Sequence, residues 1–257
     1  MRRYRWKTSF ALSILTLAAC TAAHAQQPQG PPVPNADMTR SAAHSQLRLG
    51  YYAASKAYRY QGAYNITYNA FQTGRVTFYG FADAEIEARI DRSSNEFQPD
   101  RLVGTFELGA KRIVGGSPLS LYLRHMSAHN IDRTDRLRPQ WEQAGIRYQW
   151  DRPLYQVSLS AATYLHGNNN NYRSDFDLQG GFVVVQSERN PVSIRFDLHH
   201  VGESGHVRDG FDDYWIEPNV RVSPKLNLFV GYGQTHDIDA GNGVTDHPTL
   251  VGLRFDL

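Results

Sequence analysis

Apolar and polar residues alternate along most of the chain beyond residue 47. The clearest case is residues 76–90, where every second position is apolar or small and the positions between carry charged side chains such as Glu85, Glu87 and Arg89. A period of two is the signature of a β-strand with one apolar and one polar face. At about 3.3 Å per residue, a strand of this length can cross a bilayer at a tilt.

The same alternation predicts twelve strands, with ten as the alternative count. The predicted strands are residues 47–57, 61–71, 75–91, 101–114, 118–128, 141–151, 153–166, 175–188, 191–203, 213–222, 225–236 and 248–257.

The connections between these strands alternate in length. Turn-sized connections such as Gly115–Ser117 take turns with long polar ones, at residues 92–100, 129–140, 167–174, 203–212 and 237–246. Bacterial outer-membrane barrels have short periplasmic turns and long external loops. We therefore expect an all-β protein, a single antiparallel transmembrane β-barrel with a polar, charged lumen.

The two ends of the chain fit export to an outer membrane. Residues 1–25 have a basic start, an apolar run and the small-residue site Ala23–Ala25, as in a signal peptide. Cleavage there is preferred over processing at Cys20, which would leave a lipidated N-terminus. The domain plan is a signal peptide at 1–25, a periplasmic lead-in at 26–46, and a barrel at 47–257. The alternation that ends at Leu257 resembles the terminal signal that outer-membrane barrels present to the barrel-assembly machinery.

Composition excludes several classes of protein. Four of the 27 basic residues and none of the 25 acidic ones lie in residues 1–25, so the rest of the chain carries a formal charge of −2. This gives no reason to expect nucleic acid as a partner. Cys20 is the one cysteine, so the barrel has no disulfide and no thiolate site. No apolar run after residue 25 is long enough for a membrane helix.

One hairpin, residues 118–151, places reactive side chains on its apolar face. The alternation that includes Leu119 and Leu123 continues through His125 to Ser127, and on the return strand the same face ends at Glu142. Pairing the two strands from the turn-sized end places these residues face to face: Leu119 with Trp150, Leu123 with Ile146, His125 with Ala144, and Ser127 with Glu142.

These side chains suit ester hydrolysis. Ser127 is the candidate nucleophile, His125 its general base, and Glu142 the group that orients the imidazole. His125-Met126-Ser127 resembles the His-x-Ser strand motif of outer membrane phospholipase A and the lipid A deacylases. Those families usually follow the serine with Asn, whereas Ala128 stands at that position here. The structural alternative is that His125 and Ser127 mark the crossing from hydrocarbon to the polar interface.

Two functions remain open from the sequence. The first is a serine esterase acting on acyl chains of lipopolysaccharide or phospholipid in the outer leaflet. The alternative is a non-catalytic barrel, either a narrow channel or an envelope-assembly or export component. No cofactor is expected; Asp132 and Asp135 leave calcium open. A homodimer is also left open.

Overall fold

The computed structural model describes residues 43–55, 58–91, 96–131, 140–168, 172–187, 190–202, 210–237 and 244–257. The predicted signal peptide at 1–25, most of the lead-in at 26–46, Cys20, Asp132 and Asp135 lie outside these residues. Within the described ranges, no helix is long and apolar enough to span a membrane.

The described chain is built from antiparallel strands. The first six are β1 (Ala43–Ala54), β2 (Tyr60–Thr73), β3 (Val76–Asp91), β4 (Glu96–Val114), β5 (Ser117–Asn130) and β6 (Gln140–Arg152). The others are β7 (Tyr155–Asn168), β8 (Ser174–Val185), β9 (Val192–Gly202), β10 (Phe211–Ser223), β11 (Leu226–Asp237), β12 (Val244–Asp246) and β13 (Thr249–Asp256).

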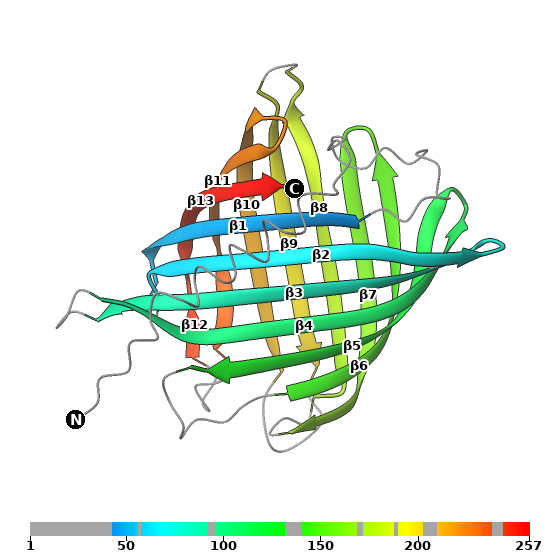
Figure 1. Ribbon diagram of the computed structural model, residues 1–257, viewed down its shortest axis with the longest axis horizontal. Coiled ribbons are helices and arrows are strands. Elements are labelled where there is room, and N and C mark those ends of the chain that lie inside the picture. The colour runs from blue at the N-terminus through cyan, green and yellow to red at the C-terminus, as the bar shows by residue number, and fades with distance from the viewer. Residues whose placement is uncertain are drawn as a thin grey trace.

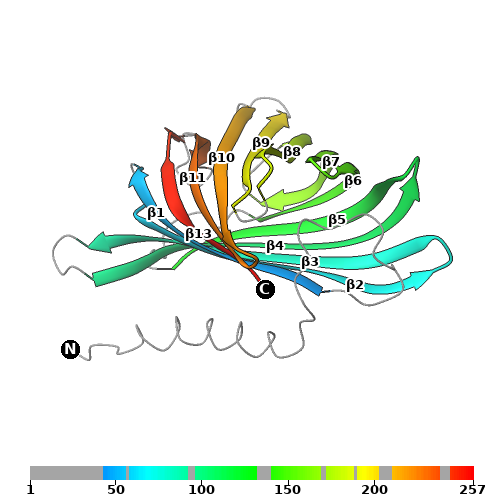
Figure 2. The same ribbon diagram turned by 90° about the horizontal axis from the view of Figure 1, so that it is seen from above.

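Twelve of these strands close into one barrel. Each strand from β1 to β11 pairs with the next along the chain, and β13 closes the ring by pairing with both β11 and β1. β12 pairs with the end of β11. In Figure 1, β1–β5 run across the view and β7–β10 run steeply across them, and Figure 2 shows β1 and β13 side by side. The predicted fold class and the count of twelve are confirmed, and the count of ten is wrong.

The two ends of the barrel differ in their connections. At one end lie tight turns, where Gly74, Gly115 and Gly116 have φ angles of 58°, 60° and 80°. Glycine adopts this left-handed conformation without the steric penalty of a Cβ atom. At the other end lie the connections predicted to be long. Each predicted loop loses some residues to strand, and the two that lose most are 92–100, where β4 begins, and 237–246, which contains β12.

The barrel has an apolar outer face and a polar lumen. Leu121 and Leu123 are 63% and 60% exposed on the outside, whereas Glu107 is fully buried inside. Water-soluble proteins show the reverse arrangement, and an extended apolar exterior suits contact with hydrocarbon. The faces predicted for residues 76–90 are confirmed at Glu87, which is buried in the lumen.

One network of buried charges lies between β3 and β6. Glu107 accepts hydrogen bonds from Arg124 and Arg147 at 2.8–3.0 Å and from the Tyr79 hydroxyl at 2.8 Å. The ring of Tyr122 lies 4.9 and 4.7 Å from the two guanidinium carbon atoms. Two cations and one carboxylate therefore share a site in which every charge has a partner.

A second network joins the strands that close the barrel. Glu217 on β10 forms ion pairs with Arg48 on β1, at 2.9 Å, and with Arg254 on β13, and it accepts a hydrogen bond from Trp215 at 3.2 Å. The ring of Phe229 lies against both guanidinium groups. Side chains thus cross the lumen below the long connections, and the interior is partly filled.

Candidate functional site

The outer face of the β5–β6 hairpin brings the predicted site residues together. His125 on β5 lies directly opposite Glu142 on β6, and Ser127 lies two positions further along β5 on the same face, opposite Gln140. All three side chains are on the outer face, and the residues lie near the end of the barrel with the long connections. The sequence alternation therefore placed these residues on the correct face.

The predicted register of this hairpin is wrong by two residues. Leu119 lies opposite Tyr148, not Trp150, and His125 therefore faces Glu142, not Ala144. A shift of two residues keeps every side chain on its own face, so alternation cannot detect it. The correction matters chemically, because the carboxylate now lies across from the imidazole it would orient, instead of across from the hydroxyl.

The distances describe a loosely assembled site. The Nδ1 atom of His125 lies 3.9 Å from the Oε1 atom of Glu142, beyond hydrogen-bond length, and the two side chains are 38% and 52% exposed. Among the described residues, no hydrogen bond joins Ser127 to His125. Residues two apart on a strand are about 6.6 Å apart along the backbone, so side-chain rotation can bring the hydroxyl and imidazole together.

Two neighbours of this site were missed by sequence reasoning. Gly104 on β4 lies opposite Ser127, and a Cβ atom there would lie 3.6 Å from the Ser127 hydroxyl oxygen. The missing side chain leaves that flank of the serine uncovered. On the other flank, exposed His166 on β7 lies opposite Glu142. The signal for both is pairing across strands, which becomes visible once the register is known.

The other residues considered in the sequence lie on different faces of the barrel wall. Ala128 is 1% exposed and belongs to the lumen wall, so it supplies no side chain to the outer face. His199 and His200 lie on opposite faces of β9: His199 is 3.1 Å from Asp175 in the lumen, and His200 is 2.7 Å from Asp212 outside. Within the described ranges, no group of His, Cys, Asp or Glu side chains could hold a metal ion.

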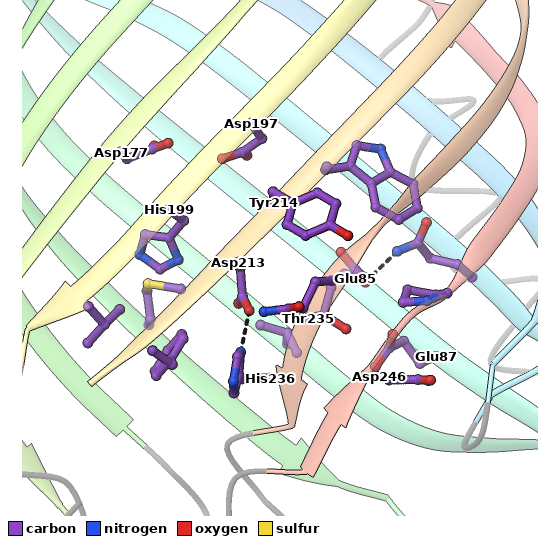
Figure 3. Close-up of a pocket in the computed structure, with 18 of the residues that line it drawn as sticks. Glu85, Glu87, Asp177, Asp197, His199, Asp213, Tyr214, Thr235, His236 and Asp246 are labelled. Atoms are coloured by element: carbon purple, nitrogen blue, oxygen red, sulfur yellow. Dashed lines mark hydrogen bonds and ion pairs between the residues drawn. The ribbon is translucent and has the colours of Figure 1, made fainter. Parts of the chain in front are cut away.

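A second concave site lies inside the barrel. The lumen holds a cavity of about 460 Å³ at the end with the long connections. Figure 3 shows Asp177, Asp197, Asp213, His199 and His236 gathered along it. Asp213 is hydrogen-bonded to His236 at 2.7 Å. This cavity is separated from the outer-face residues by the barrel wall.

Comparison with known proteins supports the fold by shape alone. No protein-family model matches the sequence, and no curated protein matches it. A crystal structure of the outer membrane phospholipase dimer of Salmonella typhi with bound calcium superposes with a TM-score of 0.60 at 9% identity, over 89% of this chain and 94% of that one. The barrel is similar in fold to outer membrane phospholipase A.

The Escherichia coli outer membrane phospholipase A gives the same result. Its TM-score is 0.59 at 9% identity, over 88% of this chain and 94% of that chain. At identity this low, the similarity lies in the path of the backbone. It shows that the chain has the fold of an outer-membrane barrel. The phospholipase activity, the calcium and the dimer belong to the solved proteins.

Proposed function

We propose that this protein is an outer-membrane lipid hydrolase that cleaves acyl esters with Ser127, His125 and Glu142. The observation that carries the proposal is the cross-strand pairing of His125 with Glu142 on the outward face, with Ser127 two residues away on the same face. A charged or ionisable pair is costly on a lipid-facing surface, and so it calls for an explanation that packing does not supply.

In the orientation that we propose, this face lies near lipid ester bonds. With the N-terminus in the periplasm, the tight turns lie in the periplasm and the long connections lie outside. The end of β5 that carries Ser127 then lies at the depth of the outer leaflet. The substrate is a phospholipid or lipopolysaccharide, and insertion depends on the barrel-assembly machinery.

The residues have separate roles in the reaction. The Ser127 hydroxyl oxygen attacks the ester carbonyl carbon while His125 accepts its proton. His125 returns that proton to the leaving alcohol oxygen, and water then releases the fatty acid from the acylated serine. Glu142 orients the imidazole and stabilises its protonated form. The short gap between His125 and Glu142 closes by a side-chain rotation once a lipid chain covers the site.

Purified wild-type protein should release fatty acid from phospholipid or from lipopolysaccharide, and the assay is run with and without calcium. Ser127→Ala and His125→Ala should each lower the rate at least about a thousandfold, whereas Glu142→Ala should retain a slow residual rate. Ser174→Ala is the matched control, because Ser174 also lies on the outer face near the long connections. Equal rates of fatty-acid release by wild type and Ser127→Ala would contradict the proposal.

The alternative is a non-catalytic barrel, a narrow channel or an envelope-assembly or export component. The partly filled lumen with a cavity at one end favours binding of a small solute over free passage. A wild-type protein that releases no fatty acid from either lipid would favour this alternative. Calcium dependence and a homodimer are proposals that the same preparations test, by chelation and by cross-linking.

A further inference from the structure

The lumen cavity has the size of a small-molecule site. Its volume of about 460 Å³ lies within the roughly 300–1,000 Å³ of typical ligand pockets. Ser55 and Pro248 line it at the level of the long connections, and Arg48 and Trp215 line it next to the Glu217 network. The cavity is therefore open toward one end of the barrel and bounded by side chains toward the other.

The lining carries an excess of negative charge. Glu85 comes from β3, and Asp177 and Asp197 come from β8 and β9, on the opposite side of the ring of strands (Figure 3). Among the described residues, none of these three carboxylates forms an ion pair with Lys or Arg. Arg48, Arg101 and Arg124 also line the cavity, but they are ion-paired with Glu217, Glu87 and Glu107 respectively.

Two of these carboxylates are hydrogen-bonded to neutral amides, and the imidazole of His199, which is paired with Asp175, lies near Asp177 and Asp197. Glu85 accepts a hydrogen bond from Gln61 at 2.6 Å, and Asp197 accepts one from Gln179 at 3.1 Å. The three carboxylates are partly buried in the lumen, and placing two aspartates side by side carries an electrostatic cost. A positively charged ligand would remove it.

Two hydrogen-bond acceptors without partners also favour a ligand that carries N–H groups. Gln61 is 8% exposed, and its Oε1 atom has no partner among the described residues because its amide NH2 group is directed to Glu85. The Oδ1 atom of Asp177 is likewise buried without a partner. Both atoms accept hydrogen bonds and donate none, so a matching ligand presents N–H groups at two separate places.

Aromatic rings complete the walls. The cavity is lined by Tyr58, Trp141, Tyr172, Phe211 and Trp215. Aromatic faces attract ammonium groups and pack against methylene chains. A linear amine offers both, whereas a neutral sugar would leave the carboxylates without a counter-charge.

We propose that the lumen cavity binds a linear organic amine with at least two ammonium groups. One ammonium group lies beside the Glu85 carboxylate and the Gln61 Oε1 atom, the other lies beside Asp177 and Asp197, and the methylene chain lies along the aromatic rings. The site is independent of Ser127 and of ester hydrolysis, since it lies on the other side of the barrel wall.

Isothermal titration of the folded, detergent-solubilised protein with spermidine tests this site. Wild type should bind saturably, and Glu85→Gln and Asp177→Asn should each weaken binding about tenfold, the loss expected for one charge-assisted hydrogen bond. Asp212→Asn is the matched control, because Asp212 is adjacent to Asp213 on β10 but is 79% exposed outside the barrel. It should leave the affinity unchanged.

Several results would overturn the proposal. These are the absence of binding to wild type, equal binding by Glu85→Gln, and equal binding of spermidine whose amines are acetylated. Displacement of spermidine by a neutral disaccharide or by calcium at equal concentration would assign the cavity to a sugar or a metal. Folding of each variant is read from its heat-dependent gel mobility. The acetylated ligand tests the charge requirement on wild type alone, should a variant fail to fold.

Discussion

The lumen and the outer face of the β5–β6 hairpin use carboxylates in opposite ways. Glu107, inside, is fully buried and held by two arginines and a tyrosine at 2.8–3.0 Å. Glu142, outside, is half exposed and has His125 at 3.9 Å. A carboxylate with several short contacts is fixed and stabilises the barrel, whereas one with a single loose contact is free to orient an imidazole.

The largest expected effect comes from removing the buried carboxylate. Glu107→Ala leaves Arg124 and Arg147 as uncompensated charges in the lumen, and we expect the free energy of unfolding to fall by about 3–5 kcal/mol. Glu142→Ala should change it by less than about 0.5 kcal/mol. Denaturant titration of the folded barrel in detergent measures both. Equal losses of unfolding free energy in the two variants would contradict the difference proposed between the lumen and the outer face.

Charge on the outer face should depend on height along the barrel. Leu121→Arg should destabilise the membrane-inserted barrel by about 2–4 kcal/mol if Leu121 faces the bilayer centre. Ile131→Arg, one residue beyond the end of β5 at the long connection, should cost about 0–1 kcal/mol. Unfolding of the barrel in lipid vesicles gives both values. Similar costs at the two positions would contradict the membrane depth assigned to the hairpin.

A smaller effect is expected from filling a gap in the lumen wall. A Cβ atom at Gly145 would overlap the ring of Tyr122, which lies across it to reach Arg124 and Arg147. Gly145→Ala should therefore cost about 1–3 kcal/mol. Gly62→Ala is the control, because the nearest atom to its Cβ would be 3.8 Å away, on Leu49. Thermal unfolding of the two variants provides the comparison, and an unperturbed Gly145→Ala would remove Tyr122 from the network.

The orientation of both regions can be tested by labelling in intact cells. A tag inserted at Asn169 in intact cells should react with an impermeant label, and one at Gly116 should be protected. The reverse pattern would turn the barrel over and move Ser127 to the periplasmic side. The fold and its networks would be unaffected, but the outer-leaflet substrate would be lost.

Much of the barrel follows from alternation alone, because each residue's face is a local property. Leu121 outside, Glu87 inside and the turn glycines Gly74 and Gly115 are all fixed by neighbours along the chain. The start of β4 at Glu96 and the short β12 lie in polar sequence, where pairing with a neighbouring strand decides the structure and the pattern carries no signal.

The site was predicted less completely than the fold. The alternation found the face shared by His125, Ser127 and Glu142, but the register depends on contacts between strands joined by a long connection, and a shift of two leaves the pattern unchanged. Gly104 and His166 enter the site only through strand pairing. The lumen cavity likewise combines residues from strands on opposite sides of the ring, which local sequence cannot bring together.

The most direct test of a catalytic outer face is covalent labelling of the serine. The folded protein is incubated with a long-chain alkyl fluorophosphonate, which phosphonylates serines activated by a neighbouring base, and the modified residue is located by mass spectrometry. The account predicts one adduct on Ser127 that is lost in His125→Ala and retained in Ser174→Ala. An unmodified Ser127 in folded wild-type protein, or an equal adduct in His125→Ala, would contradict it.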